Sequence, residues 1–143
     1  MLAKGGCLCG EVRFSAPDEV VEVGVCHCNM CQRWSGGPGF ATHSGKAPKI
    51  EGAENIKWYR SSEWAERVFC NECGSNLFYR LGGDEPQYSC FAGPFDDQKK
   101  FKLAAQTFIE EKPDYYAFAG DIPSMTGAEV FAMFAPSSNS SEG

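Results

Sequence analysis

The sequence predicts a mainly β protein with little helix, organised as a single domain over residues 1–135. Short runs of alternating or β-branched residues recur along the chain, and Gly-rich or polar segments separate them. Of the 143 residues, 43% are hydrophobic and 22% are charged, which is enough apolar material for one domain with a core. Residues 136–143 have the composition of a disordered tail.

The strands follow one another along most of the chain. Residues 11–16, EVRFSA, alternate apolar with polar or small side chains and are stopped by Pro17. Residues 20–25 form a β-branched run that leads directly into a cluster of three cysteines. Further strands are predicted at residues 40–44, 56–61, 67–70, 77–81, 88–92, 106–111 and 115–119.

Helix is expected at three places: a turn after Cys28, a turn near residues 96–100, and a segment over residues 124–134. Ser124 is the candidate N-cap of the last segment, because a serine hydroxyl accepts a hydrogen bond from an amide of the first helical turn. Gly127 lowers the helix propensity of the same segment.

The charge of the chain limits its partners. The formal net charge is −6 and the isoelectric point is near 4.9, so the chain as a whole repels nucleic acid and anionic membranes. No run of basic residues is longer than the pair Lys99-Lys100. The N-terminus does not resemble a signal peptide, and no stretch approaches the roughly 18 apolar residues of a membrane span. We therefore expect a cytoplasmic protein that binds neither nucleic acid nor membrane.

Eight cysteines in such a chain need an explanation. Seven lie in three tight clusters, C-x-C, C-x-C-x-x-C and C-x-x-C, and the eighth stands apart; they are Cys7, Cys9, Cys26, Cys28, Cys31, Cys70, Cys73 and Cys90. Closely spaced thiolates suit a metal ion better than disulfides or redox chemistry. Thiolate-rich sites select zinc or iron–sulfur clusters, and the usual ferredoxin spacings are missing. Zinc is therefore the metal we expect.

Four of these cysteines form a candidate structural zinc site. Cys70 and Cys73 have the spacing of a zinc-knuckle half-site, and Gly74 permits the left-handed turn that follows such a pair. Cys7 and Cys9, which lie in a glycine-rich turn, can supply the other two sulfurs. A metal bound by these four residues would connect distant parts of the chain and stabilise the fold.

The remaining cluster, Cys26, Cys28 and Cys31, provides three ligands. Zinc with three protein ligands and one open position is the arrangement found in catalytic sites. Two alternatives remain open: Cys90 could complete a second structural site, and His27 could act as a ligand, although its side chain is expected to point away from its neighbours. Cys90 otherwise fits a small buried residue, and His27 a hydrogen-bonding neighbour of the site or a solvated loop residue. His43 reads as an ordinary core or surface histidine.

Three segments, GGCLCGEVRF, CHCNMCQRWSG and FCNECGSNLFYR, occur in an order and at separations that resemble the glutathione-dependent formaldehyde-activating enzyme family, which also includes centromere protein V. FAGPFDD resembles a later segment of the same family, and the likeness runs from about residue 4 to about residue 120. The resemblance implies a β-tent of short antiparallel sheets around a structural zinc, and carbon–sulfur lyase chemistry on an adduct of glutathione with formaldehyde. It also implies two zinc ions per chain, with the following ligands: Cys7, Cys9, Cys70 and Cys73 for the structural ion, and Cys26, Cys28 and Cys31 for the catalytic one.

A thiol substrate such as glutathione would also need partners for its carboxylates. Arg33 is the cation nearest to the three-cysteine cluster in sequence, and the main chain of Gly36 and Gly37 could approach a ligand closely. The weaker candidates are Arg60, Arg67 and Arg80. The alternative function, from another class, is a non-catalytic two-zinc module that binds other proteins.

Overall fold

The computed structural model describes residues 2–17 and 21–134. The predicted tail at residues 136–143 lies outside the described residues. The chain divides into two compact units, of which one comprises Met1–Gly24 and Phe40–Leu103 and the other comprises Val25–Gly39 and Ala104–Gly143. The division of the chain into one domain and a tail stays a prediction.

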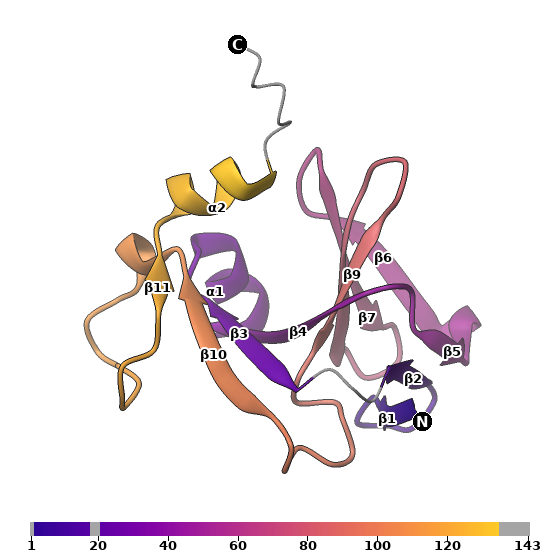
Figure 1. Ribbon diagram of the computed structural model, residues 1–143. Helices are drawn as coiled ribbons and strands as arrows, with labels where there is room; N and C mark the ends of the chain where they lie inside the picture. The colour runs from indigo at the N-terminus through magenta and orange to yellow at the C-terminus, as the bar shows by residue number, and fades with distance from the viewer. Residues whose placement is uncertain (1, 18–20, 135–143) are drawn as a thin grey trace. The chain divides into compact units, whose positions relative to one another are not determined.

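The first unit consists of antiparallel strands (Figure 1). A three-stranded sheet has the order β1-β2-β5, with β1 at Leu2–Gly6, β2 at Arg13–Pro17 and β5 at Lys49–Glu51. A second set of strands has the order β4-β9-β8-β7-β6, with β4 at Gly39–Gly45, β6 at Ile56–Arg60, β7 at Ala65–Cys70, β8 at Asn76–Leu81 and β9 at Gln87–Phe91. The short 3-10 helix η1, Ala53–Asn55, precedes β6.

The core of the first unit lies between these two sheets. Phe14 on β2 packs edge-on against Phe78 on β8, with ring centroids 5.0 Å apart, and against Phe95, with centroids 5.1 Å apart. Edge-to-face aromatic pairs of this kind add to the stabilisation that burial provides. Cys7 and Cys70 belong to the same buried cluster, so two of the predicted metal ligands border the core.

In its described residues, the second unit combines strands β3, β10 and β11 with helices α1 and α2. β3, Glu22–Cys26, and β10, Lys102–Thr107, lead from the first unit into the second, and β11, Ser124–Met125, pairs with β10 in parallel. The order of these strands is β11-β10-β3. Helix α1, Asn29–Ser35, follows β3; the 3-10 helix η2, Ile109–Glu111, follows β10; and helix α2, Gly127–Phe134, follows β11 (Figure 1). Among the residues that the structure describes, neither helix is long and apolar enough to cross a membrane.

The mainly β fold class is confirmed, and the strands predicted at residues 11–16, 40–44, 56–61, 67–70, 77–81 and 88–92 correspond to β2, β4, β6, β7, β8 and β9. The strand predicted at 20–25 corresponds to β3, and the helical turn predicted after Cys28 is α1. Strands β1, β5 and β11 were not predicted. They are short, and β1 contains two glycines, so they lack an alternating pattern.

Three predictions of local structure were wrong. The strand predicted over residues 106–111 shares only its first two residues with β10, which covers Lys102–Thr107. Phe108 has a φ of 56°, and residues 109–111 form η2. Residues 115–119 form no strand; the rings of Tyr116 and Phe118 pack against His27 instead. Residues 96–100 contain a bend and a turn and form no helix.

The start of α2 also differs from the prediction. Ser124 lies in β11, and the N-cap is Thr126, whose hydroxyl accepts a hydrogen bond of 3.1 Å from the Glu129 amide. The Glu129 carboxylate in turn accepts one of 2.8 Å from the Thr126 amide, which completes a capping box. A Cβ on Gly127 would lie 2.6 Å from the ring of Phe108, so any other residue here would force neighbouring side chains to shift.

Candidate functional site

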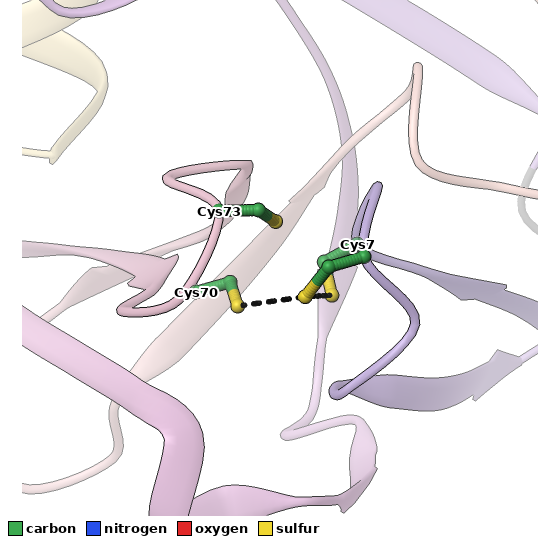
Figure 2. Close-up of side chains that lie close together, drawn as sticks. Cys7, Cys70 and Cys73 are labelled. Carbon is green, nitrogen blue, oxygen red and sulfur yellow. Dashed lines mark hydrogen bonds between the residues drawn. The ribbon is translucent and has the colours of Figure 1, made fainter.

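The first cluster of thiols joins two loops of the first unit. Cys7 and Cys9 lie on the loop between β1 and β2, Cys70 is the last residue of β7, and Cys73 lies in the turn that leads to β8. Figure 2 shows Cys70 and Cys73 extending from this turn toward the loop that carries Cys7. The four sulfurs all lie within 4.8 Å of one another.

Backbone geometry holds both loops in place. Gly10 has a φ of 85° and its amide donates to the carbonyl of Cys7 at 3.2 Å, whereas Gly74 has a φ of 79° and its amide donates to the carbonyl of Cys70 at 2.8 Å. Both values of φ lie in the left-handed region that glycine adopts without a steric penalty. Each loop therefore turns back on itself and presents its two thiols to the same side.

Amide and hydroxyl donors surround the sulfurs. The Val12 amide lies 3.3 Å from the Cys7 sulfur, and the Glu72 amide lies 3.4 Å from the Cys70 sulfur. Hydrogen bonding from the Ser75 hydroxyl, which lies 3.2 Å from the Cys73 sulfur, lowers the pKa of the Cys73 thiol to about 5. Donors of this kind favour the thiolate, which is the form that binds a metal.

The spacing of the sulfurs fits a tetrahedral metal. The Cys7 and Cys9 sulfurs are 3.6 Å apart, and the Cys9 and Cys70 sulfurs are 3.8 Å apart. Four sulfurs at the usual zinc–sulfur distance of about 2.3 Å would be separated by about 3.8 Å in a tetrahedron. A disulfide would need a distance of about 2.05 Å, and all eight cysteines are free. The donor set of this cluster therefore fits a structural zinc ion.

The second cluster of thiols lies at the junction of β3 and α1 in the second unit. Cys26 ends β3, Cys28 is the N-cap of α1, and Cys31 lies in the first turn of that helix and is buried. The Cys28 sulfur accepts a hydrogen bond of 3.3 Å from the amide of Cys31. The three sulfurs lie within 4.8 Å of one another, and no further Cys, His, Asp or Glu of the described residues joins this group.

Three thiols this close cannot all ionise without a compensating cation. The neighbouring thiols of Cys28 and Cys31, together with burial, raise the pKa of Cys26 well above its ordinary value. A bound cation would remove this penalty, because metal coordination deprotonates a thiol. The donor set therefore fits a zinc ion that has three protein ligands.

His27 lies between two of these cysteines in sequence but takes no part in their cluster. Its side chain is fully buried, and both of its ring nitrogens are engaged: Nδ1 lies 2.7 Å from the Tyr116 hydroxyl, and Nε2 lies 2.9 Å from Oε1 of Gln106. Its ring also packs against those of Tyr116 and Phe118. The expectation that His27 points away from the cluster is correct, whereas its alternative placement in a solvated loop is wrong.

Segments distant in sequence also hold the backbone of this loop. The His27 amide donates to the carbonyl of Thr107 at 3.1 Å, and the Asn29 amide donates to Oε1 of Glu111 at 2.8 Å. Nε2 of Gln32 donates to the carbonyl of His27 at 2.7 Å and to that of Glu111 at 3.0 Å. Sequence reasoning missed these partners, because no local pattern connects residues that are about 80 positions apart.

Cys90 lies in the buried core of the first unit. Its sulfur is 4.0 Å from the Ser44 hydroxyl, and burial raises the pKa of its thiol to about 11. Such a thiol stays protonated at neutral pH and behaves as a small apolar side chain. His43 is exposed on β4. Neither residue belongs to a cluster of thiols.

The residues predicted to contact glutathione lie at the end of α1. Arg33 is exposed in the last turn of this helix, and Gly36, with a φ of 77°, is its C-cap. Apart from its chain neighbours and the adjacent helix backbone, no atom of the described residues would lie within 4 Å of a Cβ placed on Gly36 or on Gly37. The main chain at both glycines is thus open to approach, and their contact with a thiol substrate stays a prediction.

The three weaker candidates belong to the first unit, where other groups engage them. Arg60 donates to the carbonyl of Glu63 at 2.8 Å, and the guanidinium of Arg67, which is buried, lies 5.2 Å from the ring centroid of Tyr79. Arg80 forms an ion pair with Glu66, and its guanidinium stacks on the ring of Trp58.

Comparison with known proteins gives concordant results. The glutathione-dependent formaldehyde-activating enzyme family matches residues 2–111. A Schizosaccharomyces pombe protein named an uncharacterized lyase is 33% identical over 127 residues, which cover 89% of this chain and 93% of that protein. A Halomonas elongata protein named "Putative glutathione-dependent formaldehyde-activating enzyme" is 30% identical over 129 residues, which cover 80% of each chain.

A solved structure supports the fold. The crystal structure of a Rhodobacter sphaeroides protein matches 65% of this chain and 87% of its own, with a TM-score of 0.56 and 22% sequence identity. At this identity the likeness concerns the fold alone. The family match spans most of the chain and contains all seven clustered cysteines. This chain belongs to the glutathione-dependent formaldehyde-activating enzyme family.

Proposed function

We propose that this protein is a zinc-dependent carbon–sulfur lyase that acts on the adduct of glutathione, or of another small thiol, with formaldehyde or a related small aldehyde. The observation that carries the proposal is the three-membered thiol cluster of Cys26, Cys28 and Cys31, which no fourth ligand atom of the described residues joins. Three protein ligands leave a coordination position for a substrate, as in catalytic zinc sites. Membership of the family and the name of the yeast relative, a lyase, support the same reaction class.

In this proposal the chain uses two zinc ions with different roles. Cys7, Cys9, Cys70 and Cys73 hold one as part of the scaffold, and Cys26, Cys28 and Cys31 hold the other. Zinc at the three-thiol cluster would supply a site at which a substrate thiol is held as thiolate at neutral pH. The proposed contacts for the substrate's carboxylates are Arg33 and the open main chain at Gly36 and Gly37. They lie at the C-terminal end of α1, the helix whose N-terminal end carries the three-thiol cluster.

The reaction itself is a reversible addition. In the forward direction the thiol sulfur forms a bond to the carbonyl carbon of the aldehyde, the C=O π electrons move to oxygen, and the thiol proton ends on that oxygen. In reverse, the carbon–sulfur bond breaks, the carbonyl forms again, and the proton returns to sulfur. Orientation of thiol and aldehyde is the contribution expected from the protein, because a positioned pair reacts as an effectively unimolecular system.

The test combines spectroscopy with a rate. With cobalt in the three-thiol cluster and zinc retained in the four-thiol cluster, glutathione should add sulfur-to-cobalt charge-transfer absorption, whereas S-methylglutathione should not. Nuclear magnetic resonance exchange measurements with ¹³C-labelled formaldehyde and glutathione should show faster exchange between free aldehyde and adduct when the zinc protein is present.

Cys90→Ser is the matched control, because Cys90 is a buried thiol outside both clusters. Its cobalt spectrum before the addition of glutathione should equal that of the wild type. If glutathione changed neither the cobalt spectrum nor the exchange rate, the proposal of an enzyme would be refuted. The two-zinc interaction module would then be the remaining function.

A further inference from the structure

The loop from Cys26 to Cys31 is hydrogen-bonded to a distant segment, residues 106–116. Gln106 and Thr107 end β10, Glu111 ends η2, and Tyr116 lies in the loop beyond it. All of these contacts lie within the second unit. The three cysteines are close together in sequence. The positions of their sulfurs therefore depend on how firmly the backbone between them is fixed.

His27 is one point of support. Because Oε1 of Gln106 accepts a hydrogen bond, Nε2 of the imidazole carries the proton, and Nδ1 is then free to accept from the Tyr116 hydroxyl. The second contact of Gln106, from its Nε2 to the carbonyl of Ile122 at 3.5 Å, is consistent with this orientation of the amide. A buried imidazole with both nitrogens engaged has one orientation, and it fixes the main chain between Cys26 and Cys28.

Glu111 is the other point of support. Its carboxylate accepts from the amide of Asn29, the first residue of α1, and its carbonyl accepts from Gln32 in the same helix. The preceding residue, Glu110, accepts from the amide of Gly127 at 3.0 Å and so serves the start of α2. Two consecutive carboxylates on η2 therefore support two different helices, and only Glu111 supports the helix that carries Cys31.

We propose that Gln106, Glu111 and Tyr116 are positioning residues of the three-thiol site. The inference rests on the proposed function, because it assigns these residues to the metal site of that function. Gln106 and Tyr116 act through the imidazole of His27, and Glu111 acts through the first amide of α1. Together they hold the Cys28 and Cys31 sulfurs at the distance that a metal requires, without touching the metal or the substrate.

The test measures the metal affinity of the three-thiol cluster by competition with a chromophoric chelator, using protein that retains zinc in the four-thiol cluster. Glu111→Ala and Tyr116→Phe should each weaken binding by roughly tenfold, the scale at which groups that orient metal ligands act. Both should also alter the cobalt d–d bands of this cluster. Glu111→Gln should recover most of the loss, since an amide oxygen still accepts from the Asn29 amide.

Glu110→Ala is the matched control: it removes the same charge from the adjacent position of η2 but affects only the start of α2. Metal affinity and cobalt bands equal to the wild type are expected for it. Tyr116→Phe deletes one oxygen and keeps the ring, so it provides the test even where Glu111→Ala does not fold.

Two results would overturn the inference: unaltered affinity and bands in Glu111→Ala and Tyr116→Phe, or an equal loss in Glu110→Ala and Glu111→Ala. These readouts are taken without glutathione, so a failed inference is distinguished from a failed function. The function would be refuted if the wild-type protein showed no response to glutathione, whatever the variants do.

Discussion

Replacing Cys9 by serine should destabilise the protein more than replacing Cys28 by serine, although neither thiol belongs to the buried core. Cys9 is exposed and Cys28 is half-buried, so lost packing cannot explain a larger effect at Cys9. The expected difference comes from the length of chain that a metal bound at each cluster would close into a loop. Cys9 connects the β1–β2 loop to Cys70, which is 61 positions away, whereas Cys28 lies inside a cluster that spans residues 26–31.

The magnitude follows from loop-closure entropy. If each bound metal is treated as a cross-link, closing a loop of about 60 residues stabilises the folded state by about 4 kcal/mol at 25 °C. Closing a loop of about six residues gives about 2 kcal/mol by the same relation. Loss of the four-thiol cross-link should therefore cost about 2 kcal/mol more, which corresponds to a melting temperature lower by roughly 4–8 °C for a chain of this size.

Calorimetric melts of the wild type, Cys9→Ser and Cys28→Ser measure this difference, once with zinc saturating and once after chelation. The gap between the variants should be present with zinc and absent after chelation, because the stripped proteins have no cross-link to lose. Cys90→Ser controls for the loss of a buried thiol that binds no metal. Equal melting temperatures with zinc, or a gap that survives chelation, would refute the reasoning.

Three further outcomes are expected. Metal analysis should find two zinc ions per chain, and a chelator should remove the one at the three-thiol cluster first while circular dichroism stays unchanged; a single ion at saturation would contradict this. Thr126→Ala should lower the free energy of unfolding by about 1 kcal/mol in urea titrations, because it removes the N-cap of α2, whereas Thr126→Ser should not. Gly127→Ala should also destabilise, although helix propensity alone predicts a gain of up to about 1 kcal/mol, because its Cβ would meet the ring of Phe108 at 2.6 Å.

Much of the fold could be predicted from local patterns. Residues 77–81 and 88–92 are runs rich in apolar and aromatic side chains separated by a polar, Gly-rich turn, which indicates strands. They correspond to β8 and β9, and Leu77, Phe78 and Cys90 of these strands belong to the buried core. The same reasoning failed at residues 115–119, where aromatic side chains imitate a strand but pack against His27. Tertiary contacts determine the backbone conformation there. Strand propensity reflects the packing of side chains on a sheet, so it fails where aromatic side chains pack against another part of the chain.

The start of α2 was predictable and was missed. Thr126 and Glu129 have the spacing of a capping box, a signal present in the sequence, whereas Ser124 has no acidic residue three positions later. The thiol clusters were found because close cysteine spacing is itself the signal. Gln106, Glu111 and Tyr116 give no such signal, because a hydrogen bond to a residue about 80 positions away leaves no periodicity to detect.

The two clusters differ in how metal binding is coupled to folding, and this difference matches the roles proposed for them. At the four-thiol cluster a bound metal would join loops that are far apart in sequence, so loss of the metal would also free these loops from each other. Such a site could not exchange ligands without cost to the fold. At the three-thiol cluster α1, His27 and Glu111 order the ligands through hydrogen bonds that involve no metal. Little chain ordering would then depend on an ion bound there, so under the proposed function a substrate sulfur would arrive and leave while the protein stays folded. The proposed catalytic site would exchange a ligand in every turnover and would need this independence, which the hydrogen bonds from residues 106–116 would provide.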